Sequence, residues 1–189
     1  MLLVWLSNRR EVGGVEVCVA GTSMEANSVS HKVEAALRLI AQNDPALAGQ
    51  ICRDVRRLLF TETSGGHYLA GIETCRIGLA YATRVPPIEL AMMIVHEATH
   101  ARLAKGGALY LGEDRGRIEH ICVEAEIAFA ERIPGSEHAV QKARALLKTE
   151  WWDAEKHSER TVSDLRQRGV PEWIAQRIVA WSLRRVQKE

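Results

Sequence analysis

Apolar positions along this chain follow two spacings, which predict strands in the first half and helices throughout. Residues 15–20 begin with alternating apolar and polar side chains and are β-branched, which is typical of a strand, and Gly13-Gly14 predicts a turn before it. Three β-rich runs follow at 58–63, 67–72 and 74–81, with a Ser-Gly-Gly turn after the first. Their order predicts an antiparallel meander.

Helical spacing begins at residue 31, where Ser30 is the expected N-cap after a polar loop at 22–30. Pro45 ends this helix and is suited to open a second one.

The longest apolar run follows Pro87 and predicts a buried helix that ends at Lys105-Gly106-Gly107. A second helix is expected at 117–132 and a third from Ser136 to about Trp152. Residues 153–189 are heavily charged and helical in pattern.

The helix after Pro87 carries His96-Glu97-Ala98-Thr99-His100, an H-E-x-x-H pattern among apolar residues. Histidines four apart lie on one helix face, so their imidazoles can take two corners of a tetrahedral metal site, for which zinc is the usual ion. Glu97 projects beside them, where a carboxylate can take a proton from a metal-bound water. The alternative is that both histidines pair with carboxylates or backbone groups.

A catalytic zinc site needs a third protein ligand, and the next helix offers two glutamates. At about 100° per residue, Glu119 and Glu126 lie on one flank of its apolar stripe, whereas His120 and Glu124 turn towards solvent. Glu119 is the preferred ligand, because the small Cys122 one turn later lets the two helices approach. Glu126 would then orient a histidine or pair with an arginine, and it remains the alternative ligand.

An H-E-x-x-H helix followed by an inward glutamate resembles the gluzincin zinc metallopeptidases. Eighteen residues separate His100 from Glu119, which is similar to the H-E-x-x-H-x(18)-E spacing of the aminopeptidase branch. The run Glu126-Ile-Ala-Phe-Ala before Pro134 is also loosely similar to the segment after the glutamate ligand in peptidases that cleave phage-type repressors. That second alignment puts the ligand between Val123 and Glu126.

The resemblance implies a zincin-like fold, with an antiparallel sheet whose edge strand lines the cleft and the motif helix behind it. It implies zinc held by His96, His100 and Glu119 or Glu126, with Glu97 as general base and a peptide or protein as substrate.

Two further features bear on this resemblance. The chain has no Gly-x-Met-Glu-Asn-type substrate-anchoring motif upstream, and Val123 stands where gluzincins often carry an acid against a ligand histidine.

For stabilising an oxyanion, Tyr110 is the preferred candidate, and His67, Tyr68 and His120 are others by position only.

These elements predict an α+β fold in two parts. Residues 1–135 are expected to form a zincin-like metal-binding domain, a small antiparallel sheet packed on the H-E-x-x-H helix, and residues 136–189 a helical C-terminal extension packed on it. An apolar stripe that includes Trp173, Ile178 and Trp181 predicts a packing face, against the domain or in a homo-oligomer formed through these helices.

Composition narrows the functional classes. A net charge of +1 over 189 residues gives no electrostatic case for nucleic acid or an anionic membrane. The apolar segment Met1–Leu6 is too short to span a bilayer and lacks the features of a signal peptide, so a buried strand or docked tail is expected. Four widely spaced cysteines are typical of reduced thiols in a cytoplasmic protein.

Three hypotheses follow from different functional classes. The first is a zinc-dependent peptidase or other amide hydrolase. The second is a catalytically inactive zincin-like zinc-binding module with a regulatory or partner-binding role. The third is a helical interaction protein whose histidines are incidental. Glu97 favours the first over the second, because only catalysis needs a carboxylate at that position.

Overall fold

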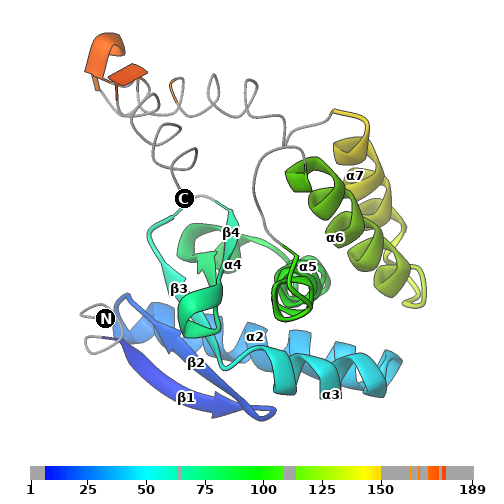
Figure 1. The fold of residues 1–189 in the computed structure, drawn as a ribbon. Coiled ribbons are helices and arrows are strands. Elements are labelled where there is room, and N and C mark those ends of the chain that lie inside the picture. Colours follow the sequence, from blue (N-terminus) through cyan, green and yellow to red (C-terminus); the bar gives the residue numbers. More distant parts are fainter. Residues whose placement is uncertain are drawn as a thin grey trace.

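The fold of the chain is α+β, built on a five-stranded sheet with the order β1-β2-β3-β5-β4 (Figure 1). A computed structural model describes residues 7–63, 65–108 and 114–149, and residues 162, 166, 170–174 and 176–177 beyond them. The strands are β1 (Asn8–Val12), β2 (Val15–Val19), β3 (Arg57–Thr61), β4 (Gly66–Leu69) and β5 (Thr74–Gly78). The helices are α2 (Ser23–Asn43), α3 (Pro45–Asp54), η1 (Ala70–Ile72), α4 (Leu79–Arg84), α5 (Pro87–Lys105), α6 (Asp114–Ala130) and α7 (Glu137–Leu147).

The sheet is mixed, so the predicted antiparallel sheet is wrong at its centre. β2 pairs with β3, and β3 with β5, in parallel, whereas the outer pairs β1–β2 and β4–β5 are antiparallel. A parallel pair needs a long crossover, and α2 with α3 supplies it between β2 and β3. Apolar alternation within a run gives no strand direction, which is why the three runs at 58–81 were predicted as a simple meander.

Two helix starts also differ from the prediction. The expected loop at 22–30 is helical, because Thr22 rather than Ser30 is the N-cap of α2. The backbone N–H of Glu25 donates to the Thr22 hydroxyl, and the backbone N–H of Thr22 donates to the Glu25 carboxylate, a reciprocal capping box. The strand predicted at 74–81 ends at Gly78 and continues as α4.

A tight hairpin at the start of the sheet confirms the predicted turn and adds a strand. Gly13 and Gly14 have φ values of 57° and 82° and join β1 to β2, with Val12 opposite Val15. Two positive φ values in a two-residue hairpin are the geometry that glycine adopts without steric cost. β1 is charged and exposed, so its sequence carried no apolar signal.

Helix α5 is buried between two layers, as its apolar sequence predicted. The sheet strands β4 and β5 and helix α2 contact it, and α6 packs against it with α7 beyond (Figure 1). Every residue from Ile94 to Thr99 is buried, so no face of this part of the helix meets solvent. The H-E-x-x-H motif therefore lies inside the core.

One hydrophobic core joins these layers. It runs from the sheet through α5 and α6 to Ala139, Val140 and Ala143 of α7. The division of the chain at residue 135 stays a prediction. Residues 1–6, Trp152, Ile178 and Trp181 lie outside the described residues, and so does most of the expected C-terminal extension.

Two sequence expectations about the environment of the chain can be compared with the structure. None of the four cysteines forms a disulfide. Within the described ranges, no helix combines the length and apolar character needed to cross a membrane.

The side chain of Lys32 stabilises the turn that connects α4 to α5. Its ammonium donates to the carbonyls of Ala82, Thr83 and Val85, which are the last carbonyls of α4 and of the turn into α5. We expect Lys32→Met to lower the free energy of unfolding by about 1.5–3 kcal/mol, because hydrogen bonds to a charged group are removed and partly buried carbonyls lose their donor. Urea denaturation measures this change.

The matched control for Lys32→Met is Arg38→Met on the same helix. Arg38 makes an exposed pair with Glu34 at 2.8 Å, so its removal should change the free energy of unfolding by less than about 0.5 kcal/mol. Equal effects of the two substitutions would contradict this role of Lys32.

Candidate metal centre

Three donor atoms from α5 and α6 converge on one point in the core. His96 Nε2 lies 3.2 Å from His100 Nε2 and 3.3 Å from Glu119 Oε2. His100 Nε2 lies 3.7 Å from the same carboxylate oxygen. The helical spacing of the motif puts both imidazoles on the side of α5 that faces α6, and Glu119 projects from the first turns of α6.

These separations suit a shared metal ion. Zinc binds histidine nitrogen and carboxylate oxygen at about 2.0–2.2 Å, so ligand atoms at the corners of a tetrahedron lie roughly 3.3–3.6 Å apart. A proton on one imidazole nitrogen can form a hydrogen bond across only one of these three short contacts. A metal cation can instead bind both nitrogens and the carboxylate oxygen at once. The residues present therefore fit a zinc ion.

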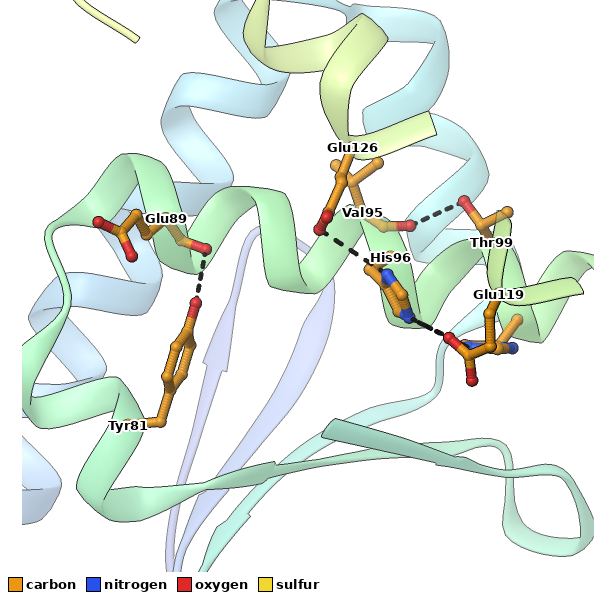
Figure 2. A network of polar contacts seen from close by, with 8 residues as sticks. Tyr81, Glu89, Val95, His96, Thr99, Glu119 and Glu126 are labelled. Atoms are coloured by element: carbon orange, nitrogen blue, oxygen red, sulfur yellow. Dashed lines mark hydrogen bonds and ion pairs between the residues drawn. The ribbon is translucent and has the colours of Figure 1, made fainter. Parts of the chain in front are cut away.

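Glu126 lies on the other side of His96, as Figure 2 shows. Its Oε2 is 3.7 Å from His96 Nδ1, so the two nitrogens of this ring face two different glutamates of α6. A carboxylate near Nδ1 favours the tautomer whose Nε2 is free to bind a metal. Among the two glutamates, Glu119 thus lies where a ligand would be and Glu126 where an orienting group would be.

The electrostatics of the cluster favour a bound cation. Burial lowers the pKa of His96, which favours the neutral imidazole that metals bind, and the hydrogen bond that the His96 ring donates to the Glu119 carboxylate partly opposes this. Burial raises the pKa of Glu97 well above its usual value, with Glu119 and Glu126 adding to the effect. Burial and the Glu119 carboxylate raise the pKa of Glu126 to about 8. If all three carboxyl groups were ionised, their charges would repel one another, and a divalent cation would offset that repulsion.

Glu97 is the most deeply placed polar group of the motif. It is 2% exposed, and its Oε2 has no hydrogen-bond partner among the described residues. A buried oxygen left without a partner costs about 1–3 kcal/mol, so its retention needs a reason other than packing. By contrast, the neighbouring Thr99 donates its hydroxyl to Val95 O at 2.8 Å and is satisfied within α5 (Figure 2).

The edge strand β4 crosses directly over Glu97. A Cβ atom added to Gly66 would lie 2.2 Å from Glu97 Oε1, 2.8 Å from Glu97 Cδ and 2.8 Å from Met93 Sδ. A side chain at position 66 would therefore have to displace Glu97 and Met93 for the strand to stay this close to the motif helix. Because side chains alternate along a strand, Tyr68 shares this face and His67 lies on the opposite one.

Gly66→Ala is expected to destabilise the protein by about 1–3 kcal/mol, since the added methyl group must displace Glu97 or Met93. Thermal unfolding measures this effect. Gly71→Ala is the matched control, because a Cβ at Gly71 meets no atom within 4 Å. In the double variant Gly66→Ala/Glu97→Ala the cost of the methyl group should largely disappear. Additive effects of the two substitutions would show that the contact is not the cause.

Of the predicted oxyanion candidates, the three that the structure describes take no part in the contacts that define the cluster. Tyr110, the preferred one, lies outside the described residues. His120 is half exposed and pairs with Glu124 at 3.5 Å on the outer side of α6, as its helical position predicted. His67 is exposed on the face of β4 away from α5, and Tyr68 is a half-buried residue packed against the core.

Cys122 was not identified from the sequence as a potential metal ligand. The residue was interpreted as a small spacer, yet its Sγ, one ring nitrogen of His96 and one of His100 all lie within 4.8 Å of one another. Its spacing, three residues after Glu119, puts both side chains on the same face of α6 and was used only to explain close helix packing; the thiol was not considered as a metal donor.

Comparisons of this chain with protein-family models, with curated proteins and with solved structures found no match. Its function therefore has to follow from the residues of the site.

Proposed function

We propose that this chain is a zinc-dependent metallohydrolase and that its substrate is a peptide or protein. The observation that carries the proposal is the convergence of His96, His100 and Glu119 within 3.2–3.7 Å of one another beside the buried carboxyl of Glu97. A purely metal-holding role explains the two histidines and Glu119. It does not explain the buried carboxyl group of Glu97, whose Oε2 has no hydrogen-bond partner among the described residues.

The roles of the residues follow from their positions. His96, His100 and Glu119 would hold the zinc, and Glu126 would orient His96 through Nδ1. A bound zinc supplies a Lewis acid that polarises a carbonyl and lowers the pKa of a water. Glu97 would take the proton of the attacking water and deliver it to the leaving amine, the task of a general base that later acts as an acid.

The sheet edge supports a peptide as substrate. β4 is the last strand in the order of the described sheet, and its Gly66 lies against Glu97. An extended peptide can pair with such an edge through main-chain hydrogen bonds, which would bring its carbonyls near the motif helix.

The second candidate is a zincin-like zinc-binding module without turnover. The observation that favours it is Cys122, because a fourth protein donor is typical of structural zinc sites, whereas catalytic sites keep a position open for water.

Zinc content and hydrolysis test the proposal together. The full chain, purified without a polyhistidine tag, is expected to contain about one zinc per chain by elemental analysis. It should cleave members of a quenched-fluorescent peptide library. This cleavage should cease when a chelator removes the zinc and return when zinc is added back. Zinc binding without any cleavage would favour the module. No zinc even after its addition would overturn both candidates.

A further inference from the structure

The Cys122 thiol lies close to both motif histidines. It is fully buried in the middle of α6, and its Sγ, one ring nitrogen of His96 and one of His100 all lie within 4.8 Å of one another. The other three cysteines lie on β2, α3 and β5, and none of them belongs to a group of potential metal ligands within the described part of the chain.

The donor set on the α6 side of the site therefore has two members. Glu119 contributes a carboxylate oxygen 3.3 Å from His96 Nε2, and Cys122 contributes sulfur one helical turn later. Zinc accepts both donor types, with zinc–sulfur distances of about 2.3 Å, so tetrahedral nitrogen–sulfur separations are roughly 3.5–3.6 Å. Because the present separations are at most 4.8 Å, Sγ would have to move by about 1 Å to reach tetrahedral distances. A change of the Cys122 side-chain torsion can provide this movement.

We propose that Cys122 is a metal ligand, which completes a thiolate-containing site with His96, His100 and Glu119. This inference rests on the metal site of the proposed function and goes beyond it by naming a fourth donor. A thiolate selects borderline and soft divalent ions such as Zn²⁺, Co²⁺ and Cd²⁺ over Mg²⁺ and Mn²⁺. It also means that the substrate-free site is closed, so that water or substrate must enter by displacing one ligand or by expanding the coordination to five.

Cobalt substitution tests this ligand without depending on catalysis. The full untagged chain is stripped with a chelator and titrated with Co²⁺. One cobalt per chain should produce a thiolate-to-metal charge-transfer absorption in the near ultraviolet, together with the intense visible bands of four-coordinate cobalt. In Cys122→Ser the charge-transfer absorption should be absent while the cobalt still binds. Cys52→Ser, which changes an exposed thiol on α3, is the control and should keep the full spectrum.

The possible outcomes separate the two proposals. Cobalt bound at one per chain without charge-transfer absorption would overturn the assignment of Cys122 and leave the metal site intact. Absorption that persists in Cys122→Ser would assign the sulfur to another cysteine. No cobalt bound by the wild type would overturn the metal site itself. If Cys122→Ser fails to fold, X-ray absorption of the zinc-loaded wild type decides: one sulfur at about 2.3 Å supports the ligand, and only nitrogen and oxygen neighbours overturn it.

Discussion

His96→Ala is expected to abolish metal binding, and with it the stabilisation that zinc gives to the fold. His96 is the centre of the cluster, because its Nε2 lies 3.2 Å from His100 and 3.3 Å from Glu119. A ligand that binds only the folded state stabilises it by about 2.7 kcal/mol at a free concentration of 100 times its Kd. Zinc should therefore raise the melting temperature of the wild type and leave that of His96→Ala unchanged.

The control for this experiment is His120→Ala, which removes an exposed histidine from the next helix. It should bind about one zinc per chain and show the zinc-dependent rise in melting temperature. If His96→Ala retained the wild-type zinc content in untagged protein, the cluster of His96, His100 and Glu119 would not be the metal site.

Glu119 and Glu126 can be separated in the same way. Glu119→Gln should reduce zinc affinity far more than Glu126→Gln, because only Glu119 faces both Nε2 atoms. Loss of an orienting carboxylate typically lowers metal affinity 10–100-fold, which is the range expected for Glu126→Gln. Isothermal titration with zinc measures both. The reverse order would make Glu126 the ligand, as one of the two sequence resemblances implied.

Glu97→Gln is expected to eliminate hydrolysis while leaving zinc content unchanged. The amide keeps the shape of the carboxyl group but cannot take a proton from water, and general-base catalysis typically contributes 10²–10⁴-fold to a rate. The substitution should not destabilise the metal-free protein, because Glu97 is buried without a partner for Oε2 and an amide carries no charge to desolvate. Peptide-cleavage rates, zinc content and thermal unfolding together give the three readouts.

Glu124→Gln is the matched control for Glu97→Gln, because Glu124 lies exposed on the outer face of α6. It should retain full activity. Undiminished cleavage by Glu97→Gln would remove Glu97 from the mechanism, and a parallel loss of zinc would indicate that Glu97 acts through the structure of the site.

The candidate cluster followed from the sequence more completely than the sheet did. Two helical rules, the four-residue spacing of His96 and His100 and the 100° step along α6, sufficed to bring Glu119 and Glu126 to the inner side and leave His120 outside. Helix position alone could not say which glutamate faces which nitrogen of His96. That depends on how α6 is placed along α5, which no local pattern records.

The errors in the fold have local and non-local causes. The capping box at Thr22 was readable, since Glu25 stands three residues later, but the polar sequence around it resembled a loop. The direction of β3 relative to β5 was not readable, because β4 lies between them in sequence and beside only one of them in space. The contact between Gly66 and Glu97 is of the same non-local kind.

The burial of residues 94–99 of α5 on all sides has a consequence for the dynamics of the site. Amide protons in the middle of this helix can exchange with solvent only when the sheet layer and α6 separate, so they should be among the slowest in hydrogen-exchange measurements. The candidate metal ligands of α5, His96 and His100, thus lie in or beside the part of the chain that is expected to exchange most slowly. These α5 side chains would lose little conformational freedom when an ion binds, because the surrounding core already restricts their positions.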